Sequence, residues 1–203
     1  MCAKIVQLPG GRQHPYLLKK IHMNIVFIGF ASCGKSAAAL EISQRLKLRF
    51  IDIDREIETR YAHTHTGLVH YREIIQQEGM QFFFNLEHTI LHDLAEENGC
   101  VIAPGGGAPM RMKNRDLLKK LGTIIYLRTD PIILFERMQA KGLPLFLRED
   151  PSIEHLERLW HERHSVYTQL ANHTIDNTHL NISATADCVL AALRESGFPA
   201  QEA

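Results

Sequence analysis

The residues best suited to chemistry begin with a glycine-framed loop at 29–36, which reads Gly-Phe-Ala-Ser-Cys-Gly-Lys-Ser. The loop matches the pattern GxxxxGK followed by Ser or Thr, and it stands between a predicted strand and a predicted helix. In that setting backbone N–H groups and the helix N-terminus face phosphate oxygens. We therefore expect Lys35 to contact the β and γ phosphates of ATP and the Ser36 hydroxyl to bind Mg²⁺. The expected nucleotide-binding residues of this loop are Gly29, Ser32, Cys33, Gly34, Lys35, Ser36 and Ala37.

Two carboxylates, Asp52 and Asp54, come at the end of the next apolar run. Alternation along an extended segment places both on one side of the chain, beside the phosphate-binding loop. One carboxylate can hold Mg²⁺, directly or through water, while the other can orient an attacking hydroxyl or accept its proton. The alternative is an ordinary acidic connection in which Asp54 caps a helix.

A glycine triplet, Gly105, Gly106 and Gly107, follows a third apolar run at 101–104. Bare backbone at this point admits a substrate closely. Taken alone, the triplet is equally explained by a flexible loop.

Short apolar runs alternate with longer amphipathic stretches from residue 24 onward. This alternation predicts an α/β fold with a parallel sheet covered on both faces, whose ligands bind beyond the carboxyl ends of the strands. The predicted strands span 24–29, 49–53, 100–104, 123–128 and 173–176. The predicted helices span 35–46, 68–97 with a break near Gly79, 131–141, 153–171 and 184–195.

Composition limits the classes of partner. Lys and Arg together number 23, as do Asp and Glu, so the chain lacks the basic balance of a nucleic-acid-binding protein. The four cysteines are widely scattered, which argues against a zinc site or a disulfide framework and favours the cytoplasm. No apolar run approaches the roughly 18 residues of a membrane span. We expect neither a membrane nor a nucleic-acid partner, and a monomer or weak dimer.

The N-terminal residues 1–22 contain a breaker cluster at 8–11 and show no pattern that predicts packing. We expect them to form an extension, which can be mobile, ahead of a domain at 23–203. Met23 stands directly before the first predicted strand and is an alternative start.

The order and spacing of these motifs resemble those of the shikimate kinases, from Met23 to roughly Ser196. Further matches are Gly79 with Glu87, Asn114 with Arg115, Arg137, and Arg163 with Tyr167. The resemblance implies a P-loop NTPase fold, a three-layer sandwich whose five-stranded parallel sheet has the order 2-3-1-4-5. It also implies a lid over ATP, at about 142–153.

The resemblance also implies roles. Asp52 corresponds to the metal-side carboxylate, and Asp54 to the acid that contacts the acceptor's hydroxyls. Gly105 to Gly107 correspond to the substrate-side triplet, Arg137 to the arginine against adenine, and Arg163 to one arginine that grips the acceptor's carboxylate. Lys35 and Asp54 are thus the expected catalytic residues.

Two departures concern the acceptor and the lid. Where the family has a second carboxylate-binding arginine, this chain has Phe84, which leaves Glu87 without its expected partner. Losing such a contact typically costs on the order of 2 kcal/mol. The lid begins Leu143-Pro144 where the family has Arg-Pro, so a cation near the transferring phosphoryl group is also missing. Arg148 or Lys141, on the same predicted loop, can replace it.

The sequence therefore predicts a kinase that transfers the γ-phosphoryl group of ATP to a hydroxyl of a small molecule. Phe84 and Glu87 would line an acceptor pocket that need not fit shikimate. Genuine shikimate kinase activity remains an alternative, because Asp54 and Arg163 are retained. A nucleotide-binding regulator that has lost catalysis is a second alternative.

Overall fold

The computed structural model describes residues 24–65, 67 and 69–198. Its centre is a parallel sheet of five strands in the order β2-β3-β1-β4-β5. The strands are β1 (Ile25–Gly29), β2 (Arg49–Asp52), β3 (Cys100–Ala103), β4 (Thr123–Arg128) and β5 (His173–Asp176). The predicted fold class and strand order are confirmed. The expected extension at 1–22 lies outside the described residues.

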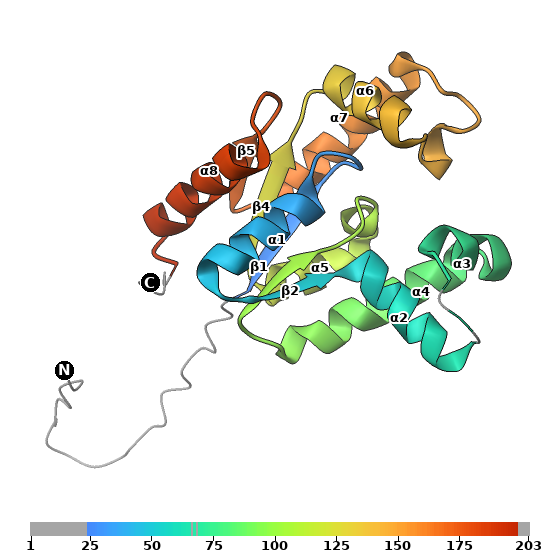
Figure 1. Ribbon diagram of the computed structural model, residues 1–203, viewed down its shortest axis with the longest axis horizontal. Helices are drawn as coiled ribbons and strands as arrows, with labels where there is room; N and C mark the ends of the chain where they lie inside the picture. Colours follow the sequence, from blue (N-terminus) through green and yellow to red (C-terminus); the bar gives the residue numbers. More distant parts are fainter. Residues whose placement is uncertain (1–23, 66, 68, 199–203) are drawn as a thin grey trace, which may run out of the picture.

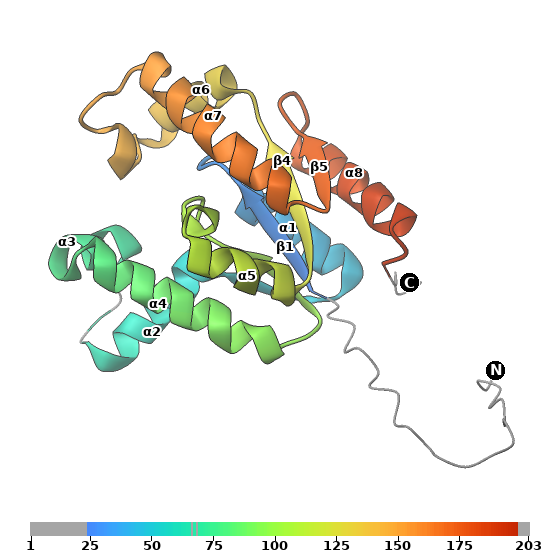
Figure 2. The ribbon, with the colours of Figure 1, turned by 180° about the vertical axis from the view of Figure 1, so that it is seen from behind.

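Helices cover both faces of the sheet (Figures 1 and 2). Helix α1 (Lys35–Leu46) packs beside α8 (Ile182–Glu195) on one face, while α5 (Met112–Leu121) and α7 (Ile153–Leu170) contact the central strands from the other. Every residue of β1 is buried, as a central parallel strand with two covered faces requires. The three layers therefore share a core on each side of the sheet.

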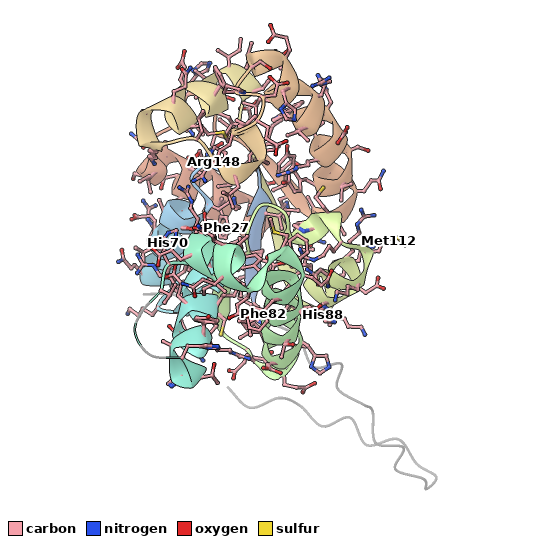
Figure 3. All side chains as sticks on the ribbon, turned by 90° about the vertical axis from the view of Figure 1, so that its right-hand side faces the viewer. Phe27, His70, Phe82, His88, Met112 and Arg148 are labelled. Carbon is pink, nitrogen blue, oxygen red and sulfur yellow. The ribbon has the colours of Figure 1, made fainter. Side chains whose placement is uncertain are left out.

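Two lobes extend beyond the carboxyl ends of the strands (Figure 3). One lobe consists of α2 (Ile53–Thr64), α3 (Tyr71–Glu78) and α4 (Met80–Asp93). The other consists of α6 (Pro131–Lys141) and the segment 142–152, which contains the short 3-10 helix η3 (Leu145–Leu147) and which we call the lid segment. Two further 3-10 helices are η1 (Leu94–Glu96) and η2 (Ala108–Met110). None of the helices in the described part of the chain is long and apolar enough to cross a membrane.

The break predicted near Gly79 is confirmed, because the φ of +83° at Gly79 interrupts the helical path and divides the predicted helix at 68–97 into α3 and α4. The structure corrects the prediction at one strand and adds two helices. The strand predicted at 49–53 ends one residue earlier, because Asp52 caps a helix that the sequence prediction lacked. That helix, α2, buries Ile53, Ile57 and Tyr61, which recur every four residues. Helix α5 was also absent from the prediction.

Candidate active site

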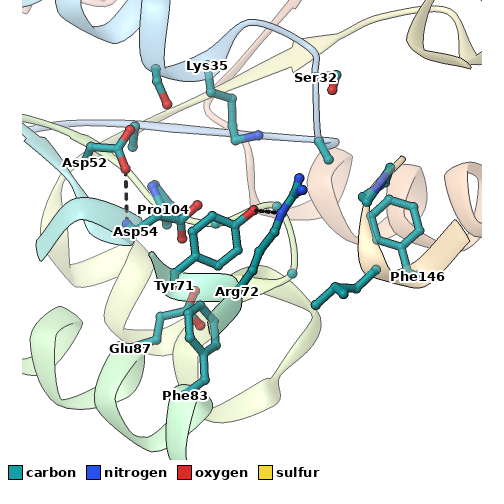
Figure 4. Close-up of a pocket in the computed structure, with 18 of the residues that line it drawn as sticks. Ser32, Lys35, Asp52, Asp54, Tyr71, Arg72, Phe83, Glu87, Pro104 and Phe146 are labelled. Atoms are coloured by element: carbon teal, nitrogen blue, oxygen red, sulfur yellow. Dashed lines mark hydrogen bonds between the residues drawn. The ribbon is translucent and has the colours of Figure 1, made fainter. Parts of the chain in front are cut away.

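A cleft of about 620 Å³ opens between the two lobes at the carboxyl ends of β1, β2 and β3 (Figure 4). Its floor is the phosphate-binding loop and the glycine triplet, and its walls come from α2, α3, α4, α7 and the lid segment. The predicted site residues that line it are Ser32, Gly34, Lys35, Ser36, Ala37, Asp52, Asp54, Phe84, Glu87, Gly105, Gly106, Gly107 and Arg163.

The phosphate-binding loop curls around the Lys35 ammonium group. Lys35 is only 9% exposed, and its Nζ donates a hydrogen bond to the carbonyl oxygen of Phe30 at 2.8 Å. Ser32 and Gly34 adopt positive φ angles of 63° and 95°, which turn the backbone back over that ammonium group. Ser36 lies exposed at the cleft. The loop therefore holds its own cation inside its curve.

Cys33 belongs to the loop, but its side chain is fully buried and does not line the cleft. Its carbonyl oxygen accepts a hydrogen bond of 2.8 Å from Nδ2 of Asn177, just after β5. Asn177 is itself held by Thr129, whose hydroxyl donates to Oδ1 at 2.6 Å. Asn177 therefore ties the outside of the loop to the far edge of the sheet, which no local sequence pattern signals.

Asp52 and Asp54 both line the cleft, although not in the way that an extended segment predicts. Asp52 is the N-cap of α2, and its Oδ1 accepts hydrogen bonds from the backbone N–H groups of Asp54 and Arg55, at 3.1 and 3.4 Å. Asp54 stands in the first helical turn. The cap is thus Asp52 rather than Asp54, and Asp54 is free to face the cleft.

The carboxyl group of Asp54 has a pKa raised to about 6, first because it is buried and then because the Asp52 carboxylate is near. The Lys35 ammonium group opposes part of this rise. A carboxyl group with such a pKa is ionised at neutral pH and still able to take up a proton. The site thus contains a candidate base beside a candidate phosphate ligand.

The glycine triplet is packed closely rather than left free. A Cβ atom at Gly105 would lie 3.2 Å from Oδ1 of Asp54 and from Oε1 of Glu87. One at Gly106 would lie 3.2 Å from the Ala31 nitrogen and from the Gly29 carbonyl oxygen. These approaches bring the acceptor side of the cleft directly against the phosphate-binding loop.

The Gly106 carbonyl oxygen also accepts a hydrogen bond of 2.7 Å from the Tyr167 hydroxyl. Tyr167 is buried in α7, and that burial raises the pKa of its hydroxyl, which keeps the donor proton in place.

The expectation that Glu87 has no arginine partner is wrong. Glu87 is 1% exposed, and its Oε2 pairs with Nη2 of Arg111, from the turn between η2 and α5. The same oxygen accepts a hydrogen bond of 3.3 Å from Nδ2 of Asn114. The Arg111 guanidinium lies 3.9 Å from the centre of the Phe84 ring, and burial lowers its pKa to about 10. Phe84 does present an apolar wall, and that wall carries a cation.

Arg163 enters the cleft from α7 between two aromatic rings. Its guanidinium lies 4.7 Å from the ring centre of Phe30, in the phosphate-binding loop, and 4.9 Å from that of Phe146, in the lid segment. The two rings meet edge to face at 5.6 Å. Arg163 therefore bridges the loop and the lid segment by cation–π contacts.

The other predicted cations divide between the cleft and the surface. Lys141 lines the cleft, whereas Arg148 is exposed and is not among the lining residues. Arg137 does not line it either, and its Nη2 donates to the Thr178 carbonyl oxygen at 3.5 Å. A cation that the sequence prediction lacked, Arg72 of α3, extends into the cleft opposite Lys35 (Figure 4).

Among the described residues, no group of three or more His, Cys, Asp or Glu side chains could hold a metal ion. The oxygen atoms of Ser36 and Asp52 on the cleft wall are the donor type that Mg²⁺ prefers. Mg²⁺ at phosphate sites usually takes only one or two protein ligands, with substrate phosphates and water completing its shell. These two residues therefore fit a metal that arrives with a nucleotide.

The family model "Shikimate kinase" matches residues 31–194. A shikimate kinase of Cupriavidus pinatubonensis is 34% identical over 176 residues, which are 86% of this chain and 88% of that protein. One of Chromobacterium violaceum is 36% identical over 167 residues, 82% of this chain and 87% of that protein.

Among solved structures, the shikimate kinase from Acinetobacter baumannii in complex with shikimate has a TM-score of 0.75 at 28% identity, over 87% of this chain and 95% of that one. Matching in family model, sequence, fold and phosphate-binding loop, this chain belongs to the shikimate kinase family, whose members are small-molecule kinases that phosphorylate a hydroxyl group.

Proposed function

We propose that this family member transfers the γ-phosphoryl group of ATP to a hydroxyl of a small acceptor held between Asp54, Glu87 and the glycine triplet. The observation that carries this proposal is that Lys35, after β1, and Asp54, after β2, line the same cleft on either side of the end of β3. A phosphate ligand and a carboxylate suited to a hydroxyl thus share one cleft, and the Lys35 ammonium group is near enough to lower the pKa of Asp54 in part.

In this reading Lys35 leaves the Phe30 carbonyl oxygen for the β and γ phosphates, and it neutralises charge on the phosphoryl group as it moves. Asp54 orients the acceptor hydroxyl and takes its proton. Most of the rate enhancement comes from positioning and from electrostatic stabilisation, since phosphoryl transfer requires no covalent intermediate with the protein.

We propose Ser36 and Asp52 as the residues on the Mg²⁺ side. Because Oδ1 of Asp52 already accepts two backbone hydrogen bonds as a helix cap, the carboxylate is held in one orientation. Mg²⁺, when bound with ATP, would neutralise charge on the phosphate oxygens. Arg137 is proposed to lie against the adenine, in the region where it bonds the segment after β5.

Shikimate is the leading candidate acceptor, since the Acinetobacter baumannii relative is described in complex with it. A regulator without catalysis is disfavoured by the site, because Lys35, Ser36, Asp52 and Asp54 all face the cleft together. Such a protein would have no need to hold the catalytic pair in place.

The decisive experiment is ADP release, coupled to a spectroscopic readout, with shikimate, sugars, polyols and amino alcohols as acceptors. We expect acceptor-dependent turnover that Lys35→Ala lowers by at least about a thousandfold. Lys119→Ala, on the exposed face of α5, is the matched control and should turn over normally. ATP binding without stimulation by any acceptor would instead support the regulator.

We further propose a cytoplasmic location and a monomer or weak dimer, which the scattered cysteines and the balanced charge favour. Light scattering after size-exclusion chromatography tests the second point, and a stable higher oligomer would contradict it.

A further inference from the structure

We infer that Arg111 and Arg163 together bind a carboxylate on the acceptor, as a two-arginine clamp. Arg111 supplies the cation that the sequence of α4 lacks. The inference rests on the proposed kinase function and narrows its acceptor to a small hydroxylated carboxylate, of which shikimate is one.

Arg111 lies on the acceptor side of the cleft. It follows η2, directly after the glycine triplet, and its side chain reaches the cleft at the wall formed by Phe84 and Glu87. The side chain is 18% exposed, so most of it is fixed by the protein while part of it faces the cleft. A guanidinium that lies over an aromatic ring and pairs with a carboxylate is held in one orientation.

The Arg111 guanidinium has hydrogen-bond donors that are unused within the described part of the chain. A guanidinium has five N–H donors in a planar fork. Among the described residues, Glu87 is the acid that pairs with Arg111, and it contacts Nη2, while Nε is buried without an acceptor. The pairing with Glu87 therefore leaves donors of the fork unused, and the Arg111 side chain lines the cleft. A planar carboxylate in the cleft offers oxygen atoms that such a fork matches.

The charges on the acceptor side of the cleft also favour an acidic acceptor. Glu87 and Asp54 flank Gly105, and without Arg111 this wall would carry two carboxylates and repel an acid. Pairing with Arg111 neutralises Glu87. Arg163 has no carboxylate partner among the described residues, since its contacts are two aromatic rings and the Tyr167 hydroxyl. The acceptor side is therefore able to attract one negative group while Asp54 remains available for a hydroxyl.

Phe84 gains a function under this inference. Its ring supports the guanidinium at 3.9 Å, an arrangement that suits the flat delocalised cation of arginine better than an ammonium group. The position where the family resemblance leads one to expect an arginine has become the platform for an arginine from another element.

The test compares shikimate with its carboxamide, which keeps the hydroxyls and loses the negative charge. Arg111→Lys keeps a positive charge beside Glu87 but loses the planar fork. We expect this variant to raise KM for shikimate about tenfold or more, with kcat changed much less and with the carboxamide affected less than about threefold. Equal effects on both acceptors would overturn the clamp.

A purely structural role, in which Arg111 only neutralises Glu87, is separated by a double variant. If that role were the whole explanation, Arg111→Ala combined with Glu87→Gln would recover the wild-type KM for shikimate. We expect no recovery from this pair. We do expect recovery when Arg111→Ala is combined with Phe84→Arg, which moves the cation back onto α4. Thermal unfolding of each variant verifies that it is folded.

Binding measurements keep this test independent of turnover. If the wild-type protein releases no ADP with any acceptor, the kinase proposal fails, but calorimetry can still measure shikimate binding. Binding that Arg111→Lys weakens about tenfold then supports the clamp. Absence of shikimate binding to the wild-type protein, with and without ATP, overturns it.

Discussion

At the scale of single residues, Asp54 shows how the site adapts an ordinary carboxyl group to its task. Its place in the first turn of α2, next to the cap residue Asp52, forces two acids together in a partly enclosed cleft. Burial and the neighbouring charge both disfavour ionisation, and the resulting pKa of about 6 gives the carboxylate more basicity than a free aspartate has.

The rate should follow this ionisation. Because the proposed role requires the carboxylate form, kcat/KM should fall about tenfold for each pH unit below about 6 and level off above it. The profile is measured at low acceptor concentration, where kcat/KM reports the enzyme without bound acceptor. An acid limb near pH 4 would show that Asp54 is not the group that titrates.

The raised pKa of Asp54 also predicts that stability falls with rising pH, whereas activity rises. A folded-state pKa above the unfolded value of about 3.8 means that the folded protein binds the proton more tightly. Stability from this source is present below about pH 4 and is lost as the pH rises to about 6. Asp54→Asn should therefore stabilise the fold at pH 8, by about 3 kcal/mol at most, while it removes activity. Urea unfolding at pH 8 and pH 4 measures the difference, which should fall below about 1 kcal/mol at the lower pH.

At the scale of elements, the lid segment contributes fewer cations to the cleft than the sequence predicts. Two cations are candidates to replace the lid arginine. Lys141, the last residue of α6, lines the cleft, whereas Arg148, which follows η3, is exposed and does not. The opposite lobe supplies Arg72 from the first turn of α3, where its Nε donates to the Tyr71 hydroxyl at 3.4 Å and no acid among the described residues pairs with it. Charge near the phosphoryl group can therefore come from α3.

We expect Arg72→Ala to lower kcat by about a hundredfold, Lys141→Ala by less, and Arg148→Ala by no more than about twofold. The KM for ATP should change little in all three variants, because the phosphate-binding loop is untouched. Steady-state kinetics with saturating acceptor measures this order. A larger loss at Arg148 than at Arg72 would return the role to the lid segment.

At the scale of the whole molecule, the sequence predicted the sheet and the phosphate-binding loop because both depend on short local patterns. Strands such as β4 and β5 are bounded by breakers, and the loop is one contiguous motif. Helix α2 could also have been predicted from the sequence, since Ile53, Ile57 and Tyr61 show helical spacing.

The contacts of Arg111 could not be predicted from a local sequence pattern. Its partners, Phe84 and Glu87, lie on a different helix, so only the packing of α4 against the turn after the glycine triplet reveals the contact. Asn177 is a similar case, because its hydrogen bond joins the segment after β5 to the phosphate-binding loop after β1. Long-range polar contacts leave no periodic trace in the sequence.

The bond from Asn177 to the loop should matter for nucleotide binding. Asn177→Ala removes a buried donor, leaves the Cys33 carbonyl oxygen without that partner, and should raise the KM for ATP several-fold. Asn181→Ala is the matched control, because Asn181 caps α8, with its Oδ1 accepting from the Ala184 N–H group at 2.8 Å. Both variants should lose about 1 kcal/mol of stability, but only Asn177→Ala should affect ATP. Equal KM values in the two would contradict this role.

The same contact sets an order of events during synthesis. Cys33 and Asn177 are separated by 144 positions, so the ribosome completes the loop motif long before it adds the residue that fixes its outer side. β5 must also pair with β4 before Asn177 can reach the Cys33 carbonyl oxygen. We therefore expect nascent chains that end before β5 to contain the entire loop motif and yet bind ATP weakly, so that nucleotide binding arises only when nearly the whole domain has emerged.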